Sequence, residues 1–343
     1  MVLATSFLLT RTFLVKKKQT KSFLLKEKAT KDYDYDRNFH RKKLLEEQCQ
    51  KYRSKTNHKK ATKIENLSPF NKDQLRLVWT KNLKIIACTP PKTGTTSWQT
   101  IFLKIMNDTK NFNYNTLPRL KNIRDLGRLG EIEKIIFDRP TMKMKETTEH
   151  KTEITMVNTR HPFIRLFSCW GDKLNKFENS SEKHKKEVNG REKSWSKIAN
   201  FETRETLKNK PNSSVYSFSA FLKYIANGAN NRHWKPVYSS CGVCSGVKYD
   251  FITKIESIDE DGKMMMRIFG QGLKTGPFPR SNQKSTNDDY DSKIRIIKDQ
   301  FKILDKSVIK KLIDIYYWDF KIFGYRIEEF YLYLYIPLPP HDT

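Results

Sequence analysis

The stretch from Ile85 to Trp98 constrains the fold of this chain more than any other, because it reads as a strand, a loop and a helix. Residues 84–88 are a short apolar run with β-branched members, and a proline pair follows it closely. Beyond the loop, apolar residues recur at helical spacing and predict a helix that starts near Thr96 or Ser97. These apolar residues are Ile101, Phe102, Ile105 and Met106.

The loop inside this stretch has the composition of an anion site. It holds one lysine, one glycine and a run of hydroxyl side chains, in the order Lys92-Thr93-Gly94-Thr95-Thr96-Ser97. A helix N-terminus favours an anion because its first N–H groups lack acceptors inside the helix, and Gly94 lets the chain pass close to a phosphate. The loop is not a Walker A motif, in which the lysine follows the second glycine. For this segment alone, an ordinary proline–glycine turn capped by a hydroxyl is the alternative.

Further strands and helices alternate along the chain. A second apolar run begins at Ile154, ends in a polar loop, and precedes a predicted helix that carries Leu166 and Phe167. Later, a strand is predicted over Tyr249–Ile255, and helices over Met264–Phe269 and Ser307–Tyr317. The helical stripe of Phe218, Phe221, Leu222, Tyr224 and Ile225 is interpreted as core. This alternation predicts an α/β fold: a P-loop-like, mainly parallel sheet flanked by helices in a single domain.

The two strand-ending loops together resemble the nucleotide-binding motifs of sulfotransferases. The first is the Lys92–Ser97 loop, and the second is Arg160 followed by Ser168 eight positions later. Five further blocks, in the right order, are similar to those of the Golgi carbohydrate sulfotransferases that act on chondroitin, dermatan and related glycans. These blocks are His233-Trp234-Lys235-Pro236, Cys241 with Cys244, Tyr249-Asp250-Phe251-Ile252, Lys254 with Glu256, and Asp319-Phe320 with Phe323-Gly324-Tyr325.

The resemblance implies PAPS (3′-phosphoadenylyl sulfate) as sulfuryl donor and a reaction that needs no metal. Lys92 is expected to neutralise charge on the leaving 5′-phosphate, aided by N–H and hydroxyl donors from Thr93, Gly94, Thr95, Thr96 and Ser97. Arg160 and Ser168 are expected to bind the 3′-phosphate. Arg165 is a further candidate ligand of the nucleotide, with a structural salt bridge as the alternative.

The acceptor hydroxyl needs a general base, since a sugar hydroxyl is hardly ionised at neutral pH. His233 is the first choice, because histidine titrates near the working range. The alternative is that His233 packs beneath Trp234 or holds the acceptor. Three glutamates are fallback bases, and three residues near His233 are candidates for acceptor recognition. The fallback bases are Glu149, Glu153 and Glu256. The candidates for acceptor recognition are Arg232, Trp234 and Lys235.

The charge of the chain indicates a polyanionic partner. Its 66 Lys and Arg residues against 38 Asp and Glu give a formal net charge of +28, which suits an acidic glycan, nucleic acid or an acidic membrane surface. No helix-turn-helix, RRM or zinc-finger pattern indicates specific reading of nucleic acid. Charge alone does not choose between these partners, and it is the family resemblance that implies an acidic glycosaminoglycan. A non-catalytic polyanion-binding protein, or an inactive sulfotransferase relative, is the alternative to the enzyme.

Three regions are expected along the chain. Residues 1–80 are interpreted as a basic arm or stem with a charged helix over Asn38–Ser54, residues 81–330 as the sulfotransferase domain, and residues 331–343 as a tail. The resemblance implies residence in the Golgi lumen or membrane. The apolar residues 1–15 are interrupted by Arg11 and fall short of the roughly 20 that a membrane-spanning helix needs, so anchoring stays open.

The five cysteines do not form the pattern of a dense disulfide scaffold. Cys241 and Cys244 have the spacing of half a zinc site, yet no second pair completes it, so a structural disulfide, between them or to another cysteine, is favoured over metal. Cys88 and Cys169 lie in apolar segments and are expected to be buried thiols.

Overall fold

One mixed sheet forms the centre of the protein. The computed structural model describes residues 33–56, 75–79, 83–107, 152–175, 217–245, 247–270, 278 and 290–334. Within these ranges the strand order is β1-β2-β3-β4, with β1 at Leu75–Trp79, β2 at Leu83–Cys88, β3 at Thr152–Thr159 and β4 at Phe251–Lys254. Strand β1 is antiparallel to β2, whereas β2, β3 and β4 are parallel to one another. The predicted mainly parallel sheet is therefore confirmed.

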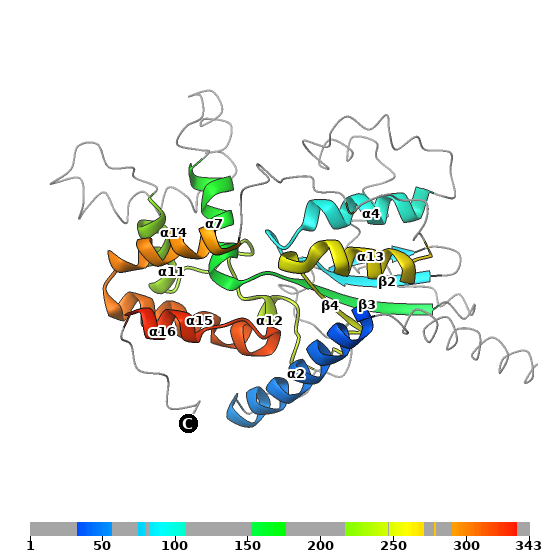
Figure 1. Ribbon diagram of the computed structural model, residues 1–343, viewed down its shortest axis with the longest axis horizontal. Helices are drawn as coiled ribbons and strands as arrows, with labels where there is room; N and C mark the ends of the chain where they lie inside the picture. The colour runs from blue at the N-terminus through cyan, green and yellow to red at the C-terminus, as the bar shows by residue number, and fades with distance from the viewer. Residues whose placement is uncertain are drawn as a thin grey trace, which may run out of the picture.

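Different helices cover the two faces of the sheet (Figure 1). Helices α4 (Thr95–Asn107) and α13 (Ile258–Ile268) lie on one face, and α2 (Tyr33–Thr56) and α12 (Val237–Ser240) on the other. Because successive side chains of a strand point to opposite faces, Ile85 and Ala87 join the core under α4 and α13, while Ile86 and Cys88 join the core on the α2 side.

A third core lies beyond the carboxyl ends of the parallel strands. It is built from helices, namely α7 (Pro162–Trp170), α11 (Phe218–Ala226), α14 (Tyr290–Lys302), α15 (Lys306–Phe323) and α16 (Glu328–Leu334). A π-helical turn over Gly171–Asn175 follows α7, and a 3-10 turn over Ile255–Ser257 follows β4. The predicted core stripe on α11 is confirmed, with Tyr224 at its partly buried edge. The predicted helices after Met264 and Ser307 are parts of α13 and α15, and the predicted strand at 249–255 is shorter in the structure.

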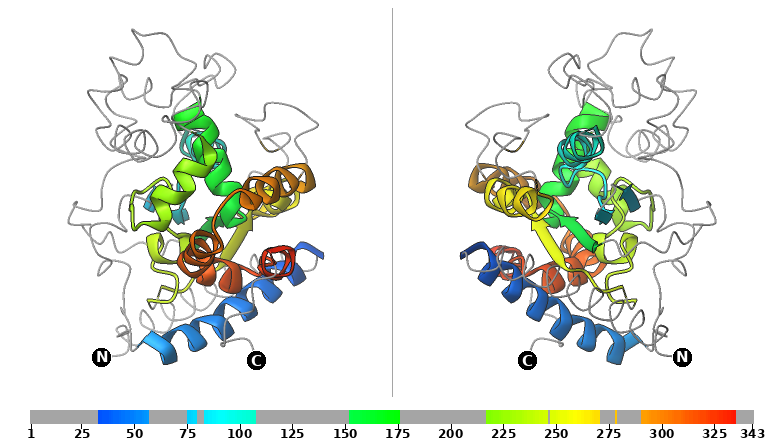
Figure 2. Two further views of the ribbon diagram at one scale, coloured as in Figure 1. Left: turned by 90° about the vertical axis from the view of Figure 1, so that its left-hand side faces the viewer. Right: turned by 90° about the vertical axis from the view of Figure 1, so that its right-hand side faces the viewer.

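Helix α2 covers the open edge of the sheet. Figure 2 shows it on one side of the strands, away from α4. The outer edge of β4 has four backbone groups to satisfy, and side chains satisfy all four. The Ile252 N–H donates to the Asn38 Oδ1 (3.1 Å), the Asn38 Nδ2 donates to the Asp250 carbonyl (2.9 Å), Arg41 donates to the Ile252 carbonyl (2.8 Å), and the Lys254 N–H donates to Asp261 (2.8 Å). Helix α2 thus occupies the place of a fifth strand.

The expected boundary at residue 80 does not separate an arm from the fold. The charged helix predicted over 38–54 is confirmed as part of α2, but this helix packs on β4 and α15, and β1 joins the sheet before residue 80. The physical reason is the pairing demand of the β4 edge, which polar residues of α2 meet. Most of the 173–212 segment and of the tail from 331 lies outside the described residues.

Two disulfides join α2 and β2 to the turn after α12. Cys49 of α2 bonds Cys244, and Cys88 at the end of β2 bonds Cys241. Structural disulfides at Cys241 and Cys244 are confirmed, each with a partner distant in sequence. The prediction of a free thiol at Cys88 was wrong, because β2 places it against the turn that holds Cys241. Cys169 is a buried free thiol as predicted, and burial raises its pKa to about 12.

We expect Asn38→Ala to lower the free energy of unfolding by about 1–3 kcal/mol, since it leaves the buried N–H of Ile252 and the partly buried carbonyl of Asp250 without partners. Urea unfolding with the disulfides intact measures this. The control is Glu46→Ala, at an exposed position of the same helix, which should stay within about 0.5 kcal/mol. Equal midpoints for the two variants would contradict the role of Asn38.

Candidate functional site

The Lys92 loop (residues 89–95) is tightly folded where β2 passes into α4. The Pro90 carbonyl accepts hydrogen bonds from the Thr93 N–H (3.3 Å), the Thr93 hydroxyl (2.7 Å) and the Thr95 hydroxyl (2.7 Å). Gly94 has φ +77°, and a Cβ there would lie 2.5 Å from the Ile255 side chain. Only glycine fits this position without displacement. The Thr93 and Thr95 hydroxyls were predicted to donate to a phosphate. In this structure they donate to the Pro90 carbonyl and stabilise the loop.

Lys92 lies in the turn of this loop with an unusual backbone. Its φ is 72°, in the left-handed region that costs a non-glycine residue roughly 1 kcal/mol. The Lys92 Nζ lies 3.1 Å from the Asp172 Oδ2, in the π-helical turn after α7. Burial lowers the pKa of Lys92, and the charge of Asp172 opposes this shift. Asp172 thus holds the partly desolvated ammonium group of Lys92.

Arg160 brings the second predicted motif to the first. It follows the last residue of β3, and its guanidinium Nη1 donates to the Lys92 carbonyl at 3.2 Å. The next residue, His161, donates its backbone N–H to Glu256 at 2.8 Å. Two loops that are 68 positions apart in sequence therefore meet at the carboxyl ends of adjacent parallel strands, where ligands bind in open α/β sheets.

Arg165 differs from the expectation that it contacts the nucleotide. Its side chain is 0% exposed, and its guanidinium donates to three backbone carbonyls: Pro91 (3.0 Å), Lys235 (2.8 Å) and His233 (3.4 Å). The expected salt bridge is replaced by carbonyl dipoles. Arg165 is a positioning residue that ties the Lys92 loop to the His233–Pro236 segment.

His233 is held beside these cations. It is 8% exposed, and within the described residues its Nδ1 has no hydrogen-bond partner. Burial first, and then the charges of Lys173, Arg232, Lys92 and Arg165, together lower its pKa to about 3. The imidazole is therefore neutral at neutral pH and has a nitrogen able to accept a proton.

Asp319 of α15 fixes the segment that follows His233. Its carboxylate accepts from the N–H groups of Val237 and Tyr238, both at 2.8 Å, and the Tyr316 hydroxyl donates to the Trp234 carbonyl. Burial raises the pKa of Asp319 to about 6, against these hydrogen bonds and the charge of Arg165. The first turn of α12 is thereby anchored to the helical core.

Residues 75–326 match the profile of the sulfotransferase family. The chain belongs to this family. It is 25% identical to carbohydrate sulfotransferase 8 of Mus musculus over 83% of the chain and 63% of that protein. It is also 23% identical to carbohydrate sulfotransferase 9 of Homo sapiens (83% and 59%) and 26% identical to carbohydrate sulfotransferase 12 of Xenopus laevis (70% and 58%). The chain thus spans about three fifths of the length of these relatives. No solved structure matches it significantly.

The remaining predicted residues occupy varied places in the structure. Thr96 and Ser97 begin α4, and Ser168 lies in the last turn of α7, close in sequence to Asp172. The Glu256 carboxylate accepts hydrogen bonds from the His161 N–H and the Tyr325 hydroxyl (3.1 Å), so it fixes the backbone next to Arg160. Glu149 and the side chain of Glu153 lie outside the described residues.

Sequence reasoning missed three supporting residues. Asp172, Lys254 and Asp319 each contact the site or its frame. Lys254 and Asp319 belong to the blocks that carried the family resemblance, and this was the available signal. Among the described ranges, no group of three His, Cys, Asp or Glu side chains is placed to hold a metal, and no helix is long and apolar enough to cross a membrane.

We expect acid to destabilise the fold through buried neutral histidines. Burial lowers the pKa of His161, which is 0% exposed and ringed by aromatic side chains, to about 3, from an ordinary value near 6.5. Between these values the unfolded chain binds the proton and the folded one does not, so stability falls as pH drops below about 6.5, by about 1.4 kcal/mol per pH unit for each such histidine.

Urea unfolding at pH 7, 6 and 5 measures this slope. His161→Asn should flatten this slope, because asparagine does not titrate. Asparagine can still cap α7, as His161 does by accepting a hydrogen bond from the Ile164 N–H. The control is His40→Asn, at an exposed position of α2, which should leave the slope unchanged. An unaltered slope in His161→Asn would refute the assignment.

Proposed function

We propose that this protein is a carbohydrate sulfotransferase that moves a sulfuryl group from PAPS to a hydroxyl of an acidic glycan, such as chondroitin or dermatan, without a metal. The observation that carries the proposal is the hydrogen bond between Arg160 and the Lys92 carbonyl. It makes the two expected anion contacts neighbours, as one nucleotide with phosphates at both ends requires. The names of the relatives support a carbohydrate acceptor.

The chain offers a P-loop-like cradle for the donor. The first N–H groups of α4 lack acceptors within the helix, as in every α-helix, and Lys92 precedes this helix by three residues with its ammonium against Asp172. Arg160 offers a planar fork of donors to the other phosphate, and Ser168 is proposed to add its hydroxyl. Asp172 holds Lys92 in place, so that an incoming phosphate meets a charge that is already positioned.

PAPS supplies an activated sulfuryl group. The bond that forms joins the acceptor oxygen to sulfur, and the bond that breaks joins sulfur to the 5′-phosphate oxygen. In the proposed mechanism Lys92 stabilises the negative charge gained by that oxygen. His233 accepts the acceptor hydroxyl proton, which its neutral imidazole can do, and the charge of the bound anions opposes the cations that now lower its pKa.

The acceptor is proposed to be acidic because cations surround His233. Lys173 and Arg232 both lower its pKa through their charge, so the surface next to the proposed base attracts anions. Residence in the Golgi lumen follows from the same family resemblance, and the two disulfides fit an oxidising compartment. A polyanion-binding protein without activity is the second candidate, which the net charge alone favours.

We expect Lys92→Ala and Arg160→Ala each to lower sulfate transfer at least about 100-fold while the fold persists, because each removes a charge that contacts the donor. Transfer of label from PAPS to a panel of chondroitin, dermatan and heparan acceptors measures this. Lys310→Ala, at an exposed position of α15 paired with Asp314, is the matched control. Full activity in both variants would defeat the donor site, and salt-sensitive glycan binding with no transfer by the wild type would favour the second candidate.

Replacement of His233 by Gln tests the base. The variant should retain binding of adenosine 3′,5′-bisphosphate and of the glycan, while kcat falls by about 10²–10⁴-fold, since only proton transfer is removed. Calorimetry gives the two affinities and initial rates give kcat. A variant with wild-type kcat would return His233 to the structural alternative.

A further inference from the structure

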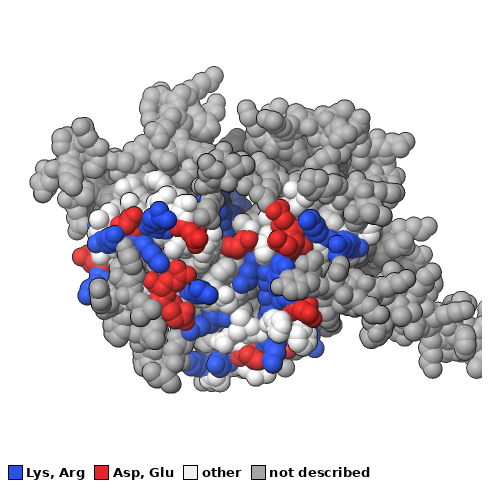
Figure 3. Space-filling view, viewed as in Figure 1, with Lys and Arg blue, Asp and Glu red and all other residues white. Residues whose placement is uncertain are grey.

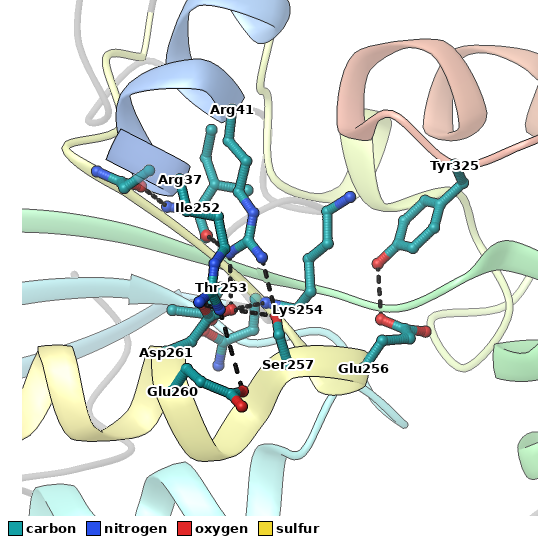
Figure 4. A network of polar contacts seen from close by, with 12 residues as sticks. Arg37, Arg41, Ile252, Thr253, Lys254, Glu256, Ser257, Glu260, Asp261 and Tyr325 are labelled. Atoms are coloured by element: carbon teal, nitrogen blue, oxygen red, sulfur yellow. Dashed lines mark hydrogen bonds and ion pairs between the residues drawn. The ribbon is translucent and has the colours of Figure 1, made fainter. Parts of the chain in front are cut away.

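Within the part of the chain that the structure describes, Lys254 carries a charge that has no counterion in contact with it. It ends β4, and its Nζ lies 4.3 Å from the centre of the Tyr325 ring. Among the described residues no carboxylate lies within ion-pairing distance of this ammonium. Figure 4 shows the side chain between Arg41 and Tyr325, with the ammonium pointing away from Asp261. A partly buried cation without a carboxylate is costly unless another anion meets it.

The two nearest carboxylates are already occupied. Asp261 accepts from Arg41 (2.7 Å), from the Ser257 hydroxyl (2.9 Å) and from the backbone N–H of Lys254 itself. Glu256 accepts from the His161 N–H and from the Tyr325 hydroxyl. Both groups are therefore fixed as parts of the frame, and neither is free to turn towards the Lys254 ammonium.

Arg41 adds to the positive charge at this position. It lowers the pKa of Lys254, which burial lowers first, to about 8. Figure 3 shows Lys and Arg side chains gathered between α13 and α2, with Asp and Glu side chains beside them. Arg37 and Arg41 pair with Asp261, so among Arg37, Arg41 and Lys254 the half-buried Lys254 is the cation for which the described residues offer no carboxylate contact.

Lys254 lies at the same edge of the sheet as Arg160, but its side chain lies beside Arg41 on the α2 face. Ile252 belongs to the core on the α2 side, and Lys254, two residues later, points to the same face. Arg160 instead reaches the Lys92 loop, and the charges that act on Lys254 are those of Arg41, Glu256 and Asp261. The two phosphate ends of one nucleotide already have Lys92 and Arg160 as partners, so a different anion is needed here.

We propose that Lys254 is an acceptor-binding residue, which contacts a sulfate or carboxylate group of the acidic glycan on the α2 side of the sheet. This inference rests on the proposed function, because it takes the acceptor to be an acidic polysaccharide. Arg41 of α2 and Asp261 of α13 are positioning residues, because Arg41 holds Asp261 and Asp261 accepts from the backbone N–H of Lys254.

The test compares Lys254→Met, which keeps the length of the side chain, with Lys254→Arg, which keeps the charge. Lys310→Met, exposed on α15, is the control. Calorimetry measures the Kd of a chondroitin sulfate oligosaccharide and, separately, that of adenosine 3′,5′-bisphosphate. We expect Lys254→Met to weaken glycan binding about tenfold and to leave nucleotide binding unchanged, with Lys254→Arg and the control near the wild type.

Several results would overturn the inference. Glycan affinity of Lys254→Met within twofold of the wild type would do so, as would an equal loss of nucleotide affinity or a fall in melting temperature that accounts for both losses. Binding of the nucleotide without binding of chondroitin, dermatan or heparan oligosaccharides by the wild type would refute this inference and leave the donor site standing. Glycan binding through Lys254 without sulfate transfer would refute the proposed function alone.

Discussion

The site depends on one buried guanidinium. Arg165 is 0% exposed and donates to carbonyls of Pro91, His233 and Lys235, so that one side chain joins the Lys92 loop to the segment with the proposed base. A buried charge needs such compensation, and several carbonyl dipoles provide it without a counterion. Lysine could not replace this residue, since its single ammonium lacks the planar fork that reaches three acceptors.

The carboxylates around the site are structural. Asp319 accepts from two N–H groups at the start of α12, and Glu256 accepts from the His161 N–H, so both fix backbone. Asp172 is the exception, because it faces Lys92. With most of the acidic groups turned to the backbone, the cations that remain give the site its positive potential, which suits two anionic substrates. The left-handed backbone of Lys92 is kept in place by the hydrogen bonds to the Pro90 carbonyl on either side of it.

The parts of this fold with local signals were predictable. The strand ending at Cys88, the loop after it and the helix after Arg160 all follow from apolar periodicity and breaker residues, and the structure shows each of them. Pairings over long distances were not predictable. Cys88 and Cys241 are separated by 153 positions, and the spacing of cysteines in the sequence does not predict which of them form a disulfide. Helix α2 looked like an arm because polar residues such as Asn38 and Arg41 carry its contacts, and patterns of apolar residues do not report those.

Three cations mark the carboxyl ends of three parallel strands, and the structure treats each differently. Lys92 follows β2 and has a carboxylate partner, and Arg160 follows β3 and donates to backbone. Lys254 ends β4 and, among the described residues, its ammonium lies over an aromatic ring and contacts no carboxylate. Because side chains alternate along a strand, a sheet can present such residues to both of its faces. In the proposed function Lys92 and Arg160, near one loop, bind the small nucleotide. The glycan is a polymer and can extend past the edge of the sheet. Helix α2 closes that edge, and for this reason a segment outside the family match helps to shape the surface on which the glycan is proposed to lie.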